Sequence, residues 1–417
     1  MLPENILPRV GILFESVSSA SPLQIINSAR GLVQPIFLLK NVHHHDKKQL
    51  NILKKRFVVE KVENASLDEI ARICKNLNLC GLLTFSDSQV ENVSMICEKN
   101  GYASLSIKAG KALQNKFIQR QALEGMDNSV HYCLFDDWIA TPSLRKKIGH
   151  PVIAKPCQGA GSKWTRLLYS VEDAKLFKQK VPQNLCFLIE EYLKGSSNYS
   201  NGFEIGDYIS VEGAHYNGSY FPVGITGKLP ISDNFSETGM FFPYKLTQEL
   251  EFEVIKQCRE ASDYLGIMNG ITHIEIKLTD NGPRIIEVNG RMGGYVYDLV
   301  KKQTGIDLIS IAFQIAINEK INVPENSEIK KPKLVFQKFI IPEIYHRCIL
   351  KKINFLLPNE KFQLELIKQE GDILDPLLGS YNNIGIIHGE AKDIKELIQI
   401  NKNLQNFIKI EVEVKHG

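Results

Sequence analysis

The sequence predicts a mixed α/β protein with a parallel-sheet unit at its N-terminus, a central α+β region and a smaller mixed α/β tail. Three observations predict this class. Strand-like and helix-like runs alternate over residues 9–109, β-rich segments with one long amphipathic helix follow, and Pro324 and Pro332 with nearby lysines mark a linker. We divide the chain into four segments, residues 1–110, 111–189, 190–325 and 326–417.

The first segment alternates strands and helices in a β-α-β rhythm, which predicts a small parallel sheet. Serines at positions 21 and 66 precede apolar periodic runs and are typical helix caps. No GxGxxG follows the first strand, so dinucleotide binding is not indicated there. The pattern predicts strands at residues 10–14, 35–39 and 81–85, and helices at residues 21–32, 66–79 and 86–100.

The two middle segments begin with a helix and become β-rich. Gly213 and Asn217-Gly218 are expected turns between strands over residues 207–230. Periodicity predicts helices at residues 111–124, 171–180, 247–265 and 305–318, and strands at residues 150–156, 165–170 and 185–193.

Residues 272–289 alternate in the manner of two paired strands, with Asp280-Asn281-Gly282 as the turn. The register decides the chemistry. A two-residue loop, Asn281-Gly282, would put Glu275 and Glu287 on opposite faces. A three-residue loop with Gly282 left-handed would pair Thr279 with Pro283. It would set Glu275 opposite Glu287 and His273 opposite Asn289, on one face.

Facing carboxylates at about 4 Å repel by roughly 4 kcal/mol at an effective dielectric near 20. We therefore expect either one protonated member or a cation between them. Hard oxygen ligands without thiolates suit Mg²⁺, so the hairpin predicts a magnesium site, with a solvated surface hairpin as the alternative.

A glycine-rich loop, CQGAGS at residues 157–162, connects two predicted strands, so it is not a P-loop. Such a loop can still fold over phosphates and offer backbone N–H donors. Lys155 ends the strand that enters the loop, which places a cation beside the same phosphates. Each feature alone is common, and their adjacency is what indicates phosphate binding.

The composition excludes several classes of function. Fifty basic and 47 acidic residues give a net charge of +3, which provides no electrostatic footprint for nucleic acid or an anionic membrane. No apolar run is long enough to span a bilayer, and the N-terminus lacks the pattern of a signal peptide. The eight cysteines show no CxxC spacing, so we expect buried thiols of a cytoplasmic protein. We expect His43-His44-His45-Asp46 to be a solvated loop.

Six motifs within residues 116–291 together resemble the ATP-grasp superfamily, in its carboxylate–amine ligase branch. They are IAKPCQGAGS, LIEEYLKG, GDYISVEG, GITGKLP, HIEIK and IIEVNGR. Within that branch, EEYLKGS, FSETGM and the run from GDYISVEG to GITGKLP are most similar to the bacterial L-amino acid ligases, dipeptide synthetases of the bacilysin-synthetase type. The resemblance implies an ATP-grasp fold with an N-terminal Rossmann-like domain, a lid at residues 111–189, a magnesium and substrate region at residues 190–325 and a small C-terminal domain.

The resemblance also implies roles for individual residues. Lys116, Lys155 and Lys228 would contact ATP phosphates, and Arg291 would stabilise the acyl phosphate. Glu237 would meet the amino group of a substrate. The remaining expected site residues are the loop residues Gly159, Ala160, Gly161 and Ser162, the adenine edge Glu190, Glu191, Tyr192 and Leu193, and the Mg²⁺ ligands Glu275, Glu287 and Asn289.

Two positions depart from the relatives' pattern. Trp164 stands where many relatives have glycine, which puts the pose of the glycine loop in doubt. Met240 stands where the bacilysin-type enzyme has histidine, so amino-acid preference does not transfer. For Arg291, a salt bridge to Asp298 or a neighbour is the alternative to a substrate contact.

The sequence thus predicts an ATP-dependent ligase that joins one amino acid's carboxylate to another's amine through an aminoacyl phosphate, releasing ADP and phosphate. ATP and Mg²⁺ are the expected cofactors, with two ions bound and Mn²⁺ accepted by the same ligands. Amino acids are the expected partners, and a homodimer is compatible with the sequence. Two alternatives stay open: a carboxylase that activates bicarbonate, and a non-catalytic ATP-binding module.

Overall fold

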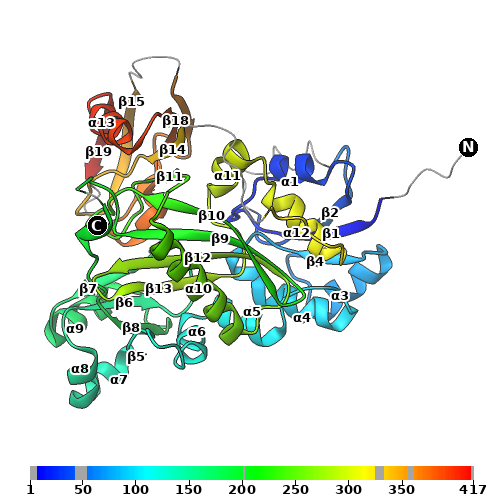
Figure 1. Ribbon diagram of the computed structural model, residues 1–417, viewed down its shortest axis with the longest axis horizontal. Helices are drawn as coiled ribbons and strands as arrows, with labels where there is room; N and C mark the ends of the chain where they lie inside the picture. Colours follow the sequence, from blue (N-terminus) through cyan, green and yellow to red (C-terminus); the bar gives the residue numbers. More distant parts are fainter. Residues whose placement is uncertain (1–6, 43–53, 201, 325–332, 356–360, 415–417) are drawn as a thin grey trace, which may run out of the picture.

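The computed structural model describes residues 7–42, 54–200, 202–324, 333–355 and 361–414, which form four sheets and their covering helices (Figure 1). The histidine run 43–45 and most of the linker after Pro324 lie outside the described residues. Among the residues described, no helix combines the length and hydropathy needed to cross a bilayer.

The N-terminal sheet is parallel, as predicted, with strand order β3-β2-β1-β4. Ser21 and Ser66 cap the first two helices, each in a capping box with the residue three positions on. The expected helix 86–100 begins with a single 3₁₀ turn, η2, that carries Asp87. The elements are β1 Arg9–Phe14, α1 Pro22–Ala29, β2 Gln34–Leu39, β3 Val59–Lys61, α3 Leu67–Asn76, β4 Gly81–Leu83, η2 Asp87–Gln89 and α4 Val90–Asn100.

The expected single helix 111–124 is wrong, because Asn115 breaks it. Asn115 has extended backbone, and its side chain accepts hydrogen bonds from the N–H groups of Phe117 and Ile118, so it caps a second helix. Lys116 therefore occupies the first position of that helix. The two helices are α5 Ile107–Gln114 and α6 Lys116–Ala122.

A small antiparallel sheet of order β5-β8-β6-β7, here called the lid sheet, follows α6. The glycine loop connects β6 to β7, as expected. Aromatic side chains, with Trp138 and Phe187 at most 2% exposed, pack the lid helices against the sheet. The elements are β5 Tyr132–Leu134, α7 Phe135–Ala140, α8 Pro142–Ile148, β6 Val152–Pro156, β7 Arg166–Leu168, α9 Val171–Lys180 and β8 Phe187–Glu191.

An eight-stranded antiparallel sheet of order β13-β12-β9-β10-β11-β14-β18-β16 runs through the molecule, so strands from the tail extend the central sheet. In the central strand β11, adjacent residues face opposite cores. Phe241 lies in the core with α10, and Phe242 lies in the core with α11, α12 and the N-terminal sheet. The strands are β9 Tyr208–Tyr216, β10 Ser219–Lys228, β11 Gly239–Phe242, β12 Gly270–Thr279, β13 Gly282–Asn289, β14 Leu334–Phe339, β16 Gln363–Leu366 and β18 Gly385–Ala391.

One expected turn in this sheet is confirmed and the other is wrong. Asn217 and Gly218 join β9 to β10. Gly213 lies inside β9 and not in a turn. The ring of Tyr220 occupies the space that a side chain at this position would need, since a Cβ on Gly213 would stand 2.2 Å from that ring.

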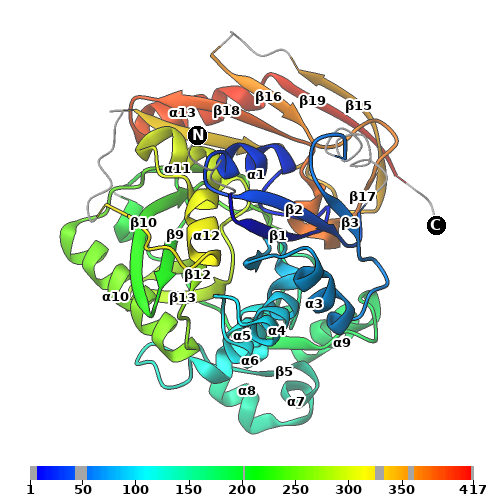
Figure 2. The same cartoon turned by 90° about the vertical axis from the view of Figure 1, so that its right-hand side faces the viewer.

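The remaining helices cover the large sheet, and α12 lies between it and the N-terminal sheet (Figure 2). The expected boundaries after residues 110 and 189 fall inside α5 and β8, and the four-segment division stays a prediction. The other elements are η3 Ser197–Ser200, α10 Gln248–Leu265, α11 Val296–Thr304, α12 Leu308–Ala316, β15 Cys348–Phe355, β17 Ile373–Leu374, η4 Pro376–Asn382, α13 Ile394–Gln405 and β19 Ile408–Val414.

Candidate active site

A cavity of about 670 Å³ lies where the lid sheet, the eight-stranded sheet, the N-terminal segment and the tail meet. This volume suits a nucleotide with small substrates. Of the residues expected at the site, all but Asn289 line it: Lys116, Lys155, Gly159, Ala160, Gly161, Ser162, Glu190, Glu191, Tyr192, Leu193, Lys228, Glu237, Glu275, Glu287 and Arg291. Asn289 lies next to the cavity, where its side chain donates to the His273 carbonyl at 3.4 Å.

The strand register places Glu275 opposite Glu287 and His273 opposite Asn289, as predicted, but by a different route. The turn is the two residues Asp280-Asn281, with Thr279 paired to Gly282, so both expected loops are wrong. The Thr279 hydroxyl closes this turn by donating to the Gly282 carbonyl at 2.7 Å. A bulge next to Glu275 then shifts the register by one residue and restores the facing pair.

Each facing carboxylate already has its own cation. Lys116 Nζ lies 3.0 Å from a Glu287 oxygen, and His273 Nε2 lies 3.5 Å from a Glu275 oxygen. Burial would raise the pKa of Glu275, but His273 and Lys228 outweigh it and lower the pKa to about 2. Each carboxylate thus has a cationic side chain beside it, so the repulsion between the two does not by itself require a divalent cation, and the magnesium site stays a prediction.

The donors nevertheless fit a hard divalent cation. Glu275 is ionised and faces Glu287 on the wall of the cavity, with the Asn289 amide directly after them on the same face. Among the described residues no group of three or more His, Cys, Asp and Glu side chains is arranged to hold a metal. A set of two carboxylates and one amide is compatible with that finding.

A buried carboxylate, Glu212, stands behind this wall and was not singled out from the sequence. It is fully buried, contacts His273 Nδ1 through one oxygen, and accepts the N–H of Gly293 at 3.1 Å through the other. Burial would lower the pKa of His273, but Glu212 outweighs it and raises the pKa to about 9. Only the alternation of charged residues along β9 and β12 could have indicated this pairing.

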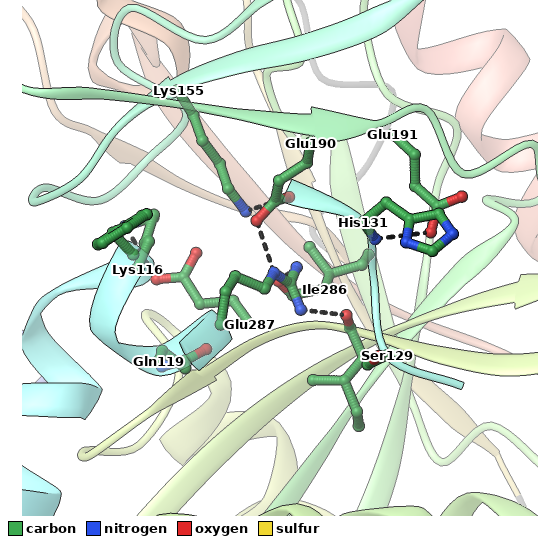
Figure 3. Close-up of polar contacts among 12 residues, drawn as sticks. Lys116, Gln119, Ser129, His131, Lys155, Glu190, Glu191, Ile286 and Glu287 are labelled. Carbon is green, nitrogen blue, oxygen red and sulfur yellow. Dashed lines mark hydrogen bonds and ion pairs between the residues drawn. The ribbon is translucent and has the colours of Figure 1, made fainter. Parts of the chain in front are cut away.

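Lys155 and Glu190 form a buried ion cluster with Arg120 (Figure 3). Lys155 Nζ and Arg120 Nε lie 2.8 and 2.6 Å from the two oxygens of Glu190, and Arg120 also donates to the carbonyls of Ile285 and Ile286. Burial would raise the pKa of Glu190, but the two cations lower it to about 2. Arg120 had no sequence signal, because only the fold brings α6, β8 and β13 together.

Lys228 was expected to contact the ATP phosphates and Glu237 the amino group of a substrate. In the structure these two side chains contact each other. Lys228 Nζ donates to Glu237 at 2.7 Å, and the lysine is 1% exposed. Burial would lower the pKa of Lys228, but Glu237 and Glu275 outweigh it and raise the pKa. The lysine is therefore charged and lines the cavity beside Glu237.

Arg291 pairs with Asp87 of the N-terminal segment, with Nε 3.2 Å from the carboxylate. The alternative partner named from the sequence, Asp298, instead accepts a hydrogen bond from Gln24 at 3.0 Å. Asp87 also lines the cavity, so the N-terminal segment contributes a charged group that the sequence did not reveal.

The glycine loop and the residues after it are held over the cavity by contacts from α6 and from the tail. Lys116 Nζ donates to the Gly159 carbonyl at 2.5 Å, and the Trp164 N–H donates to the Leu377 carbonyl at 2.7 Å. Trp164 has φ of 57°, which a glycine would adopt more easily. Met240, the other departure, is 1% exposed and belongs to the hydrophobic core.

The buried-thiol expectation holds for six cysteines and is wrong for Cys80 and Cys186, which are exposed. Cys157, at the start of the glycine loop, has its Sγ 2.8 Å from that of Cys186, and burial raises its pKa further above the ordinary range of a thiol.

Comparisons with known proteins show which families this chain is similar to. Residues 148–298 match the model of the ATP-grasp domain. The alanine–anticapsin ligase of Bacillus subtilis is 25% identical over 307 residues, covering 68% of this chain and 64% of the relative. The chain thus matches somewhat less than two thirds of that relative's length.

Solved structures share the fold over nearly the whole chain. The L-amino acid ligase of Bacillus licheniformis superimposes with a TM-score of 0.75 at 18% identity, covering 99% of this chain and 100% of that one. Phosphoribosylglycinamide synthetase of Anaerococcus prevotii gives 0.67 at 20% identity, covering 98% and 100%. Residues 148–298 are thus similar to the ATP-grasp domain, and the chain shares the fold of these solved enzymes over nearly its whole length.

Proposed function

We propose that this protein is an ATP-dependent ligase that joins the carboxylate of one L-amino acid to the amine of another. The reaction passes through an aminoacyl phosphate and releases ADP and phosphate. One observation supports this most strongly: a single cavity gathers the glycine loop, three lysines, two facing carboxylates and Arg291. The match to alanine–anticapsin ligase supports the choice of amino acids as substrates.

The part of the cavity that would hold the ATP phosphates is lined by three lysines and the glycine loop. A carboxylate is a poor electrophile until phosphorylation gives it a leaving group, and transferring a phosphoryl group is mostly a matter of positioning and electrostatics. Lys116 of α6, Lys155 of the lid strand β6 and Lys228 of the central strand β10 all line the cavity. Backbone N–H groups of residues 159–162 would close over the phosphates.

Glu275, Glu287 and Asn289 would hold Mg²⁺, which when bound supplies positive charge to the phosphate oxygens. We propose two ions, and the same oxygen ligands would accept Mn²⁺. Lys116 contacts Glu287 now and would turn to the phosphates when nucleotide binds.

The adenine edge follows the lid sheet. The Glu190 carboxylate is occupied by Arg120 and Lys155, so its contribution would come through the backbone. Strand pairing of β8 ends at Glu191, and the backbone groups of Tyr192 and Leu193 lie directly after it on the cavity wall. These groups would hydrogen-bond the base.

At the substrate end, Arg291 would bind the oxygens of the acyl phosphate, where its planar fork suits two acceptors. Glu237 would accept hydrogen bonds from the amino group of the substrate, since this residue lines the cavity beside Lys228. A cytoplasmic location and a homodimer stay predictions.

Incubation with ATP, Mg²⁺ and amino-acid mixtures, followed by separation of nucleotides and peptides, tests the proposal. We expect ADP, phosphate and a dipeptide, with L-alanine as the first amino acid to try. AMP and pyrophosphate would refute the mechanism. ATP turnover stimulated by bicarbonate without amino acids would indicate a carboxylase, and ATP binding without any turnover would indicate a binding module.

A further inference from the structure

The turn η4 in the tail, residues 376–382, folds over the glycine loop. The Trp164 N–H donates to the Leu377 carbonyl at 2.7 Å, and the Ser380 N–H donates to the Gly161 carbonyl at 2.9 Å. The ring of Tyr381 lies 3.1 Å from where a Cβ on Gly161 would stand. Two backbone hydrogen bonds and a ring contact thus join the tail to the loop.

The same turn contacts Glu237. The Ser380 hydroxyl accepts the N–H of Glu237 at 3.2 Å, and the Glu237 carboxylate accepts from Lys228. Ser380 therefore uses its backbone N–H on the glycine loop and its side chain on Glu237. One residue spans the phosphate side and the substrate side of the cavity.

The docked conformation is strained, so it depends on these contacts. Ser162 and Trp164 have φ of 56° and 57°, which non-glycine residues rarely adopt. Gly379 has φ of 54° and ψ of −133°, a conformation open to glycine. A Cβ on Gly379 would stand 2.4 Å from the Gly161 carbonyl oxygen, so the close approach also requires glycine there.

We propose that residues 376–382, here called the C-terminal latch, position the glycine loop and couple its docking to the substrate site at Glu237. This role rests on the proposed function for what the loop and Glu237 bind. An amino acid that fixes Glu237 would hold Ser380, and Ser380 would hold the loop over the nucleotide. By linkage, bound nucleotide would strengthen amino-acid binding by the same factor.

The first test compares Gly379→Ala with Gly371→Ala in the full-length protein. Both glycines have positive φ in the tail, but a Cβ on Gly371 meets nothing within 4 Å. Limited trypsin digestion without ligands reports whether the loop is docked, through the rate of cleavage after Lys163. We expect Gly379→Ala to raise that rate about tenfold or more and Gly371→Ala to leave it near wild type, since opening a docked segment controls cleavage.

The second test measures coupling. AMP-PNP with Mg²⁺ is titrated by calorimetry without and with the amino acid that gives wild type its fastest ADP release. We expect the amino acid to tighten nucleotide binding by roughly five- to tenfold in wild type, and Ser380→Ala to bring that factor close to one. Ser380→Thr keeps the hydroxyl acceptor and should recover most of the coupling.

The outcomes separate the latch from the proposed function. Equal trypsin cleavage in the two glycine variants, or undiminished coupling in Ser380→Ala, overturns the latch while wild-type ligase activity stands. A wild type that binds no AMP-PNP overturns the proposed function. In that case the trypsin comparison, which uses no ligand, still decides whether the tail docks the loop. Circular dichroism spectra of all variants confirm that each is folded.

Discussion

The same cavity contains two clusters of acidic side chains, and their carboxylates are paired with cations in different ways. The Glu190 cluster contains Arg120, Lys155 and Glu190, and both oxygens of Glu190 have cations at 2.6 and 2.8 Å. The Glu275–Glu287 pair has one cation contact for each carboxylate, at 3.5 and 3.0 Å, and the two side chains keep 29% and 15% of their surface exposed. The Glu190 side chain keeps 7%.

This difference in pairing indicates which of the two clusters can change its contacts when a ligand binds. Because Glu190 is fully paired and Arg120 extends to two β13 carbonyls, this cluster joins the lid to the large sheet. Within the part of the chain that the structure describes, each carboxylate of the facing pair has one cation in contact, and both carboxylates line the cavity, so these cations can turn to other anions. We therefore expect substitutions at Glu190 to act mainly on stability, and substitutions at Glu287 to act mainly on activity.

Glu287→Gln should have the largest effect. It removes one of the two facing carboxylates that we propose hold Mg²⁺, and we expect the rate of ADP release to fall roughly a thousandfold, or about 4 kcal/mol in activation free energy. The fold should survive, since Lys116 keeps its bond to the Gly159 carbonyl. Glu260→Gln, which alters an exposed helix pair, is the matched control and should leave both quantities near wild type. Unchanged turnover in Glu287→Gln would remove this residue from the site.

Glu190→Gln should reverse the pattern by lowering the free energy of unfolding by about 3 kcal/mol. Removing one partner of a buried ion cluster leaves the charges of Arg120 and Lys155 uncompensated. Chemical denaturation of this variant beside Glu287→Gln checks the contrast. If the two variants lose equal stability, the facing pair is also a structural cluster and the distinction fails.

The pH dependence of stability tests the same difference between the two clusters. The pKa of Glu190 is lowered from an ordinary value of 4.5 to about 2, so its stabilisation is complete above pH 4.5 and is lost as the pH falls toward 2. This group should cost wild type about 2 kcal/mol of unfolding free energy between pH 5 and pH 3. Glu190→Gln lacks that contribution, so its difference from wild type should shrink over this window. A difference that stays constant with pH would show that Glu190 is not stabilised as a charged group.

Residues close in sequence were placed well from the pattern alone, and long-range partners were not. The alternation of β12 and β13 indicated paired strands, but Glu275 faces Glu287 through a bulge that gave no signal, because both loops expected from the sequence are wrong. Lys155 could be assigned to the strand entering the glycine loop because both lie in one motif. Arg120 and Asp87 could not be found, because the fold alone brings α6 to β8 and the N-terminal turn η2 to Arg291. The sequence of the tail was uninformative about its role, and the structure shows that its strands extend the central sheet.

Asp87→Asn should have the smallest effect, because Asp87 orients Arg291 without being expected to bind a reacting group. The carboxylate holds Arg291 Nε at 3.2 Å, and the guanidinium also donates to the Met292 carbonyl at 3.0 Å and to Asn289 Oδ1 at 3.4 Å, so these two supports remain. We expect ADP release to fall about tenfold, which corresponds to about 1.4 kcal/mol. Asp68→Asn breaks an exposed pair with Lys99 in the same segment and should change activity little. A loss as large as that of Glu287→Gln would mean that Asp87 itself belongs with the facing carboxylates, so that the responsive side of the cavity extends into the N-terminal segment.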